Sequence, residues 1–249
     1  MKSGPSKIAV VTGASSGIGE ATAVRLSKEG FEVVLGARRA ERVEVVAKQS
    51  GGRAMPLDVT DQASVDAFCA QLDRVDVLVN NAGLASGLDQ IDAISDKDVN
   101  VMLDTNVGGL IRMTRALMRR LEESGDGHIV NVGSIAGFET YVGGAGYTAS
   151  KHAARAVSRT MRLELVGKPV RVTEVAPGMV ETEFSLVRFR GDTAQADKTY
   201  EGMKPLSAAD VADCIAWAVT RPSHVNIDEI VVRPVAQATA TMVARSTDA

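Results

Sequence analysis

Tyr147 and Lys151 stand four residues apart at the start of a strong helical pattern. Residues at this spacing share one face of a helix, so the phenol and the ammonium would lie close together. A free phenol has a pKa of about 10, and a nearby ammonium would stabilise the phenolate and lower that pKa. The pair could then exchange a proton with an alcohol or carbonyl oxygen. Ordinary surface packing produces the same spacing, so this chemistry needs support from other parts of the chain.

A glycine-rich turn gives the first support. It reads T-G-A-S-S-G-I-G from Thr12 to Gly19 and lies between a β-branched run and a helical pattern. Glycines let a ligand approach the backbone closely, and the free amides at a helix N-terminus suit a pyrophosphate. The spacing differs from the commoner G-x-G-x-x-G fingerprint of dinucleotide sites. A plain tight turn is the alternative for this segment taken alone.

Two arginines, Arg38 and Arg39, end the second apolar run, about 20 residues beyond the glycine turn. An NAD-binding fold usually presents an acid to the ribose 2′-hydroxyl at this place, whereas a guanidinium suits a 2′-phosphate. We therefore predict NADP rather than NAD, with Arg38 as the phosphate ligand and Arg39 stacked on adenine. A solvated helix start is the alternative, although cations at a helix N-terminus oppose the helix dipole.

Polar residues also follow the later apolar runs. Asp58 ends the third run, where it could bond an adenine amino group or serve as a turn residue. Asn80-Asn81-Ala82-Gly83 ends the fourth run, and its small residues would let a ribose lie against the backbone. Ser134 follows the fifth run. Asn106 lies inside a helical pattern despite its poor helix propensity, which indicates a specific role.

The elements that must position these residues are strands alternating with helices, the pattern of a parallel sheet. Strands are expected at 8–12, 32–36, 54–57, 75–80, 128–132, 170–176 and 227–232. Helices are expected at 17–29, 40–49, 61–72, 96–122 with a possible break near 103, 146–166 and 207–219. No Pro- or Ser-rich linker interrupts the 249 residues. The sequence therefore predicts a single α/β domain over residues 1–249.

Three long segments, 84–95, 134–146 and 178–205, break this alternation, and each follows a predicted strand. Ligands of open parallel sheets bind beyond the carboxyl ends of the strands, so these segments should form the substrate site. In the third, which we call the substrate loop (residues 178–205), Arg188 or Arg190 could bind a substrate carboxylate. Alternatively, both arginines pair with Asp192 or face solvent.

Composition excludes several classes of protein. The formal net charge is −3, which gives no basic field for nucleic acid. No signal-like segment and no apolar stretch of about 18 residues occurs, so we expect a cytoplasmic protein without a membrane partner. Cys69 and Cys214 have no second cysteine or histidine at metal-ligand spacing, so we interpret both as core residues and expect no metal.

In order and over nearly the whole chain, these motifs resemble the short-chain dehydrogenase/reductase family. The resemblance implies a Rossmann-type, doubly wound, seven-stranded parallel sheet with helices on both faces, and a homotetramer or homodimer built on the two long helices. It also implies that Tyr147 is the general acid/base, that Lys151 lowers its pKa, that Ser134 holds the substrate oxygen and that Asn106 anchors a water. The implied cofactor-binding residues are Gly13, Ser15, Ser16, Gly17, Ile18, Gly19, Arg38, Arg39, Asp58, Val59, Asn80, Ala82, Gly83, Tyr147, Lys151, Pro177, Gly178, Val180 and Thr182.

The last strand and the substrate loop resemble the branch of NADP-dependent 3-hydroxy acid dehydrogenases, which oxidise serine and allo-threonine. The resemblance thus implies a short 3-hydroxy acid as substrate, with Ser134 and Arg188 as substrate-binding residues. A broad-range ketone or 3-oxoacyl reductase is the alternative among enzymes. A non-catalytic regulator that senses NADP is the alternative from another class, but such a protein would have no use for an acid/base phenol.

Overall fold

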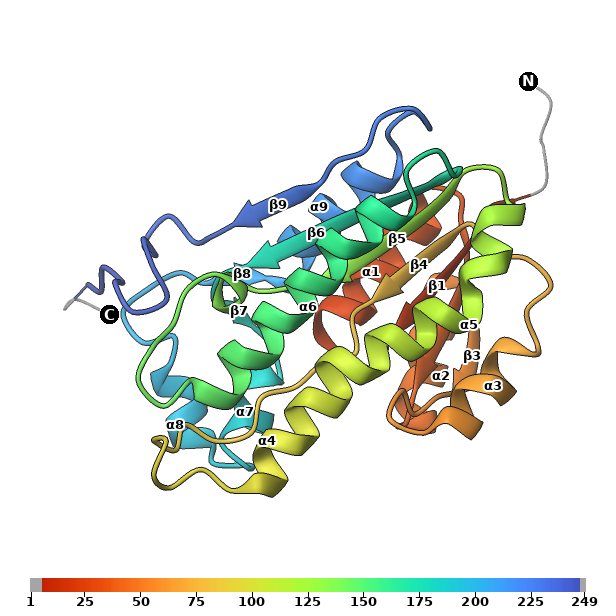
Figure 1. Ribbon diagram of the computed structural model, residues 1–249. Helices are drawn as coiled ribbons and strands as arrows, with labels where there is room; N and C mark the ends of the chain where they lie inside the picture. Colours follow the sequence, from red (N-terminus) through yellow and green to blue (C-terminus); the bar gives the residue numbers. More distant parts are fainter. Residues whose placement is uncertain (1–5, 247–249) are drawn as a thin grey trace.

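The computed structural model describes residues 6–246, which form a seven-stranded parallel sheet in the order β3-β2-β1-β4-β5-β6-β9 (Figure 1). Each expected strand is present, with its bounds within two residues of the prediction. The strands are β1 Ile8–Thr12, β2 Glu32–Ala37, β3 Arg53–Pro56, β4 Val77–Asn80, β5 Gly127–Val132, β6 Val170–Pro177 and β9 Glu229–Val232. The order reverses beside β1, so the chain winds outward in both directions, as in the predicted Rossmann-type fold.

Helices cover both faces of the sheet. They are α1 Gly17–Lys28, α2 Ala40–Ser50, α3 Gln62–Cys69, α4 Asp96–Leu103, α5 Leu110–Glu123, α6 Ala145–Glu164 and α9 Ala208–Val219. Helices α4, α5 and α6 cross one face, and α1 and α9 lie behind the sheet (Figure 1). Each face has its own core, because side chains alternate along every strand: Val10 and Leu78 are buried on the α5 side, and Val11 and Val79 on the α1 side.

The helix expected over 96–122 is broken after Leu103 by a π-helical turn, Asp104–Gly109. Asn106 lies in this turn and is 3% exposed. A π-turn adds a residue to the helical ladder and is frequent at functional sites, because it redirects side chains. The break therefore presents Asn106 to the strand ends and lets α5 continue along the sheet.

The substrate loop contains short strands and helices, although no strand or helix was predicted in it. It forms β7 Val180–Glu181, α7 Phe184–Arg188, α8 Thr193–Lys198 and β8 Leu206–Ser207, and β7 pairs with β8 in parallel. In Figure 1 these elements gather at the arrowhead end of the sheet, beyond β4, β5 and β6. Long segments after the strands thus converge on one edge, as predicted.

The chain after β9 holds the substrate loop from outside. Gln237 is 5% exposed, and its Oε1 accepts a hydrogen bond from the Met179 amide at 2.8 Å. The Ser246 amide donates to the Gly202 carbonyl, also at 2.8 Å. We call residues 233–246 the C-terminal strap. It contacts the loop near the beginning and near the end of the loop.

None of the described helices is both long and apolar enough to cross a membrane. Residues 6–246 also contain no cluster of side chains that could hold a metal ion. Cys69 is buried in the core and Cys214 is partly buried on α9, and both are free thiols. Burial raises the pKa of the Cys69 thiol to about 11, which leaves it unreactive at neutral pH.

Candidate active site

A cleft beyond the carboxyl ends of the strands brings together most of the predicted site residues. Asn81, Leu84, Thr105, Glu183, Phe184 and Val187 also line it. Gly19, Asn80, Asn106 and Arg188 are not part of its lining. The predicted residues that line it are Gly13, Ser15, Ser16, Gly17, Ile18, Arg38, Arg39, Asp58, Val59, Ala82, Gly83, Ser134, Tyr147, Lys151, Pro177, Gly178, Val180 and Thr182.

The glycine turn packs directly on the end of β4. Gly13 has φ +64°, and a Cβ there would lie 2.8 Å from the Ala82 Cα, so only glycine fits. The Asn81 side chain donates to the Thr12 carbonyl at 2.9 Å, which fixes the turn against the neighbouring strand. A Cβ at Gly19 would meet both Asn81 Nδ2 and the Gly13 carbonyl. Gly19 is thus required for packing inside the turn, whereas Gly13 lines the cleft.

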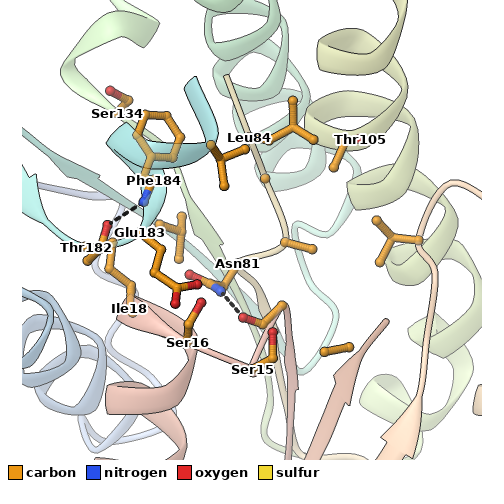
Figure 2. Close-up of a pocket in the computed structure, with 18 of the residues that line it drawn as sticks. Ser15, Ser16, Ile18, Asn81, Leu84, Thr105, Ser134, Thr182, Glu183 and Phe184 are labelled. Atoms are coloured by element: carbon orange, nitrogen blue, oxygen red, sulfur yellow. Dashed lines mark hydrogen bonds between the residues drawn. The ribbon is translucent and has the colours of Figure 1, made fainter. Parts of the chain in front are cut away.

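The outer end of the cleft is a cluster of charges. Arg39 donates to the Ser16 hydroxyl at 2.7 Å and pairs with Glu183 at 2.8 Å. Arg42 pairs with the other oxygen of Glu183 at 2.5 Å. Hydrogen bonds from Arg39 and then Arg42 lower the pKa of Glu183 to about 2. Figure 2 shows the Glu183 side chain extending toward Ser15 and Ser16.

Asp58 is a turn residue in this structure, and its bond to an adenine amino group stays a prediction. It lines the cleft beside Val59, and its Oδ1 accepts from the Thr60 amide at 3.0 Å and the Thr60 hydroxyl at 2.7 Å. Burial raises the pKa of Asp58, but the Thr60 hydrogen bonds outweigh that effect and lower it. Asn80 instead points into the protein, where its amide donates to Thr114 and Asn131.

Tyr147 and Lys151 occupy the inner end of the cleft on the first turns of α6. The Lys151 Nζ donates to the Val132 carbonyl at 2.9 Å and lies 5.9 Å from the centre of the Tyr147 ring. Burial lowers the pKa of Lys151 to about 8, and the negative charge of Glu174 opposes that effect. Burial raises the pKa of Tyr147, while the Arg188 charge and the Ser134 hydroxyl lower it. Burial dominates, so the pKa of Tyr147 is raised in this structure.

Asn106 is bound to the loop after β4 rather than to the cleft surface. Its Nδ2 donates to the Leu84 carbonyl and its Oδ1 accepts from the Leu84 amide, both at 2.8 Å. A Cβ at Gly83 would lie 3.1 Å from Asn106 Oδ1 and 3.6 Å from Lys151 Nζ. Gly83 therefore brings the amide and the ammonium together without a side chain between them. The water expected on Asn106 stays a prediction.

The two candidate arginines of the substrate loop differ in their partners. Arg188 lies over the Tyr147 ring, with its Cζ 4.9 Å from the ring centre, and it donates to the Tyr141 hydroxyl at 3.1 Å. Its Nε is buried and has no hydrogen-bond partner among residues 6–246. Arg190 pairs instead with Asp89 at 3.1 Å and Asp98 at 3.0 Å. Of the two, only Arg188 lies beside Tyr147.

Sequence reasoning missed several members of this site. Asn81 lies inside a predicted motif, but only its neighbours in that motif were predicted as site residues. Arg42 lies in the first turn of α2, shortly after Arg38 and Arg39, a position that could have suggested a third cation. Glu183 and Tyr141 gave no signal, because their partners are 47 or more residues away in the chain.

Comparison with known proteins identifies relatives over almost the full length. The family model described as short chain dehydrogenase matches residues 7–191. An uncharacterised oxidoreductase of Mycobacterium tuberculosis is 60% identical over 234 residues, which cover 94% of this chain and 93% of the relative. The NADP-dependent 3-hydroxy acid dehydrogenase of Salmonella typhi is 43% identical over 237 residues, which cover 92% of this chain and 96% of that protein.

The fold is similar to that of solved dehydrogenases. A closed form of serine dehydrogenase complexed with NADP+ superimposes with a TM-score of 0.91 and is 40% identical. The match covers 96% of this chain and 99% of that one. The serine dehydrogenase of Escherichia coli gives a TM-score of 0.80 at 35% identity, with 92% and 99% of the two chains covered.

Proposed function

Since the chain belongs to the short-chain dehydrogenase family, we propose that it is an NADP-dependent oxidoreductase that interconverts a short 3-hydroxy acid, such as serine or allo-threonine, and the corresponding 3-oxo acid. Two comparisons support this proposal: a relative is an NADP-dependent 3-hydroxy acid dehydrogenase, and a similar structure is a serine dehydrogenase with NADP+. The residues of the cleft support the proposed cofactor, the proposed proton transfer and the proposed substrate in turn.

The cleft fits a dinucleotide with a 2′-phosphate. Gly13 packs against Ala82 without a side chain and lines the cleft, so a ligand in the cleft would meet its bare backbone. Arg38, Arg39 and Arg42 follow β2, where an NAD site would have an acid. Arg38 lines the cleft and is exposed, so its guanidinium can bind a phosphate oxygen. These residues would hold NADP.

NADP, when bound, accepts hydride from the carbinol carbon or returns it to the carbonyl carbon. In the oxidation, the phenolate of Tyr147 takes the hydroxyl proton of the substrate. Ser134 donates a hydrogen bond to the same oxygen and holds it beside the phenol. The Lys151 ammonium stabilises the phenolate, and it is held in place by the Val132 carbonyl. In the reduction, Tyr147 returns the proton to the oxygen.

The position and the missing partner of Arg188 are the observations that support an acid as substrate. A guanidinium stacked on the acid/base phenol, with a buried and unpartnered Nε, lacks the anion that such a group needs in a protein interior. A carboxylate two carbons from the reacting oxygen would supply that anion and form a charge-assisted hydrogen bond. A neutral ketone would leave Arg188 unpaired, so the structure favours a hydroxy acid over a broad-range ketone or 3-oxoacyl substrate.

Initial rates with NADP and with NAD across short 3-hydroxy acids, sugar alcohols and secondary alcohols test this function. We expect the highest kcat/KM for a 3-hydroxy acid with NADP. Arg188→Ala should raise the KM for the acid about 10- to 100-fold, the loss of one charge-assisted hydrogen bond. The KM for a neutral alcohol should stay unchanged, and any loss of kcat from the missing charge beside Tyr147 should be shared by both substrates. Arg190→Ala is the matched control, because Asp89 and Asp98 hold that guanidinium.

The alternatives have clear outcomes in the same assay. Equal kcat/KM for acids and neutral ketones, unchanged by Arg188→Ala, would favour the broad-range ketone or 3-oxoacyl reductase. NADP binding without turnover of any compound would favour the NADP-sensing regulator. Burial of Tyr147 and Lys151 is evidence against the hypothesis of an NADP-sensing regulator. Burying these polar groups is costly and serves no purpose in a binding module.

We also propose a cytoplasmic homotetramer with one domain per chain. Leu103 on α4 is 37% exposed and Ile111 on α5 is 40% exposed, and both line a shallow apolar hollow beside the π-turn. Apolar side chains grouped in this way on a helix pair suit a helix–helix interface between subunits. Light scattering of the purified protein would give the mass of the assembly. The variant Ile111→Glu should reduce that mass.

A further inference from the structure

The inner face of α6 carries a polar stripe where a doubly wound fold normally packs apolar side chains. Three of its members bond to the sheet or its edge. Ser158 accepts from Asn131 at 2.9 Å, Arg155 donates to Glu229 at 2.8 Å and Arg162 donates to the Asp228 carbonyl at 3.1 Å. The stripe consists of Lys151, Arg155, Ser158 and Arg162, which recur at helical spacing.

Glu174 lies beneath this stripe on β6 and is 1% exposed. It is in register with Asn131 on β5 and with Glu229 on β9, so all three side chains point to the α6 side of the sheet. Arg155 is already bound by Glu229. The Oε1 of Glu174 is buried and has no hydrogen-bond partner among residues 6–246. A buried carboxyl in this position is costly unless a positive charge compensates it.

Lys151 is a buried cation that has no ion-pair partner among residues 6–246. Its Nζ donates to a neutral carbonyl, that of Val132, and the residue is 7% exposed. Lys151 and Glu174 contact the same segment, Val132-Gly133-Ser134. The Glu174 carboxyl packs so closely on Gly133 that a Cβ there would collide with Glu174 Oε1. The carboxyl thus packs against the same short backbone that carries the acceptor of Lys151 and the hydroxyl of Ser134.

We propose that Glu174 is a positioning residue for the acid/base pair: its buried carboxylate, packed behind Gly133, is the counter-charge that keeps Lys151 protonated beside Tyr147. This inference rests on the proposed roles of Tyr147 and Lys151. Charges interact over several ångströms in a protein interior, so no direct hydrogen bond between Glu174 and Lys151 is needed. The absence of a side chain at Gly133 leaves room for the Glu174 carboxyl against this segment.

Groups on two elements set the charge of Glu174 itself. Burial raises its pKa, Arg155 on α6 lowers it and Glu229 on β9 raises it, with smaller lowering effects from Lys151 and Arg162. The carboxylate in turn raises the pKa of Lys151 against the effect of burial. Loss of the Glu174 charge should therefore let Lys151 give up its proton at a lower pH.

The substitution Glu174→Gln removes the charge and keeps the shape. We expect the pKa of Lys151, followed by NMR of protein with 13C-labelled lysine side chains, to fall by about one pH unit. The alkaline limb of the kcat profile should move to lower pH by the same amount, with an unchanged KM for NADP. Asp228→Asn removes an exposed carboxylate from the same edge and should move neither the NMR titration nor the limb.

Glu174→Asp is the second variant, and it covers the case in which the glutamine variant does not fold. The shorter side chain keeps a carboxylate but withdraws it from Gly133, so an intermediate pKa of Lys151 is expected. An unchanged Lys151 titration in a folded Glu174 variant would overturn the proposal. The NMR titration needs no turnover, so it stands apart from the proposed function, which fails if Tyr147→Phe retains full activity.

Discussion

The Arg39 guanidinium and the Glu183 carboxylate form an ion pair of 2.8 Å that crosses the mouth of the cleft. Arg39 follows β2 and contacts the glycine turn, whereas Glu183 belongs to the substrate loop. The pair therefore ties the side that would hold the cofactor to the side that would hold the substrate. A 2′-phosphate near Arg39 would compete with Glu183 for the same guanidinium.

Removal of this competing anion should strengthen NADP binding. The variant Glu183→Gln is expected to lower the Kd for NADP about two- to fivefold, the worth of a partly exposed ion pair. The Kd for NAD should stay the same, because NAD has no 2′-phosphate. Calorimetric titration measures both constants. The exposed Glu181→Gln is a matched control, and an equal change for the two cofactors would contradict the competition.

Replacement of Arg38 by Asp should reverse the preference for the cofactor. The carboxylate would repel a 2′-phosphate and could accept from a 2′-hydroxyl, so kcat/KM with NADP should fall about 10- to 100-fold. The kcat/KM with NAD should stay the same or increase. Arg53→Asp makes the same change of charge on β3, away from the cleft lining, and should leave the ratio unaffected. An unchanged ratio in Arg38→Asp would refute the assignment.

The phenol of Tyr147 should matter far more for proton transfer than for cofactor binding. Tyr147→Phe is expected to reduce kcat about 10²- to 10⁴-fold, the usual contribution of a positioned acid/base. Its Kd for NADP should change little. Tyr141→Phe removes the hydrogen bond to Arg188 and leaves Tyr147 intact, so it should raise KM more than it lowers kcat. Steady-state rates of both variants separate the two roles.

His128 should make the fold sensitive to acid. It is fully buried on β5, and burial, followed by the charges of Arg171 and Lys7, lowers its pKa to about 3. A depressed histidine pKa means that the unfolded chain binds the proton first. Stability is therefore lost as pH falls below about 6.5.

Because of His128, we expect the free energy of unfolding to fall by about 2 kcal/mol between pH 7 and pH 5. Urea unfolding at the two pH values measures this loss. His128→Gln should retain a hydrogen bond to Thr173 and reduce the difference between the two values. A wild-type chain with no larger loss than the variant would show that His128 is already protonated in the fold.

Most of the sheet was predictable from sequence because buried parallel strands require β-branched runs. The fourth strand begins at Val77 rather than 75, and Asp76, just before it, bonds to Ile8 through both its backbone amide and its carboxylate. Asn106 marked the break in the long helix, but the π-turn depends on hydrogen bonds with Leu84, which lies 22 residues away.

The site was predictable where a motif is local and unpredictable where two distant segments meet. The glycine turn and the pair Tyr147 and Lys151 are local. The pairing of Arg39 with Glu183 spans 144 residues and has no pattern in the chain. Glu174 gave a signal that was not used, an acid inside the strand V-R-V-T-E-V-A-P, which also contains Arg171 and Thr173. Burial alone could show that this charge faces α6.

The C-terminal strap has a consequence for how the protein is made. Residues 178–205 leave the ribosome before Gln237 and Ser246, which bond to Met179 and Gly202. A nascent chain that has already paired β1 to β6 thus cannot yet fix its substrate loop. The side of the cleft that this loop forms would therefore be fixed only after the strap has been synthesised.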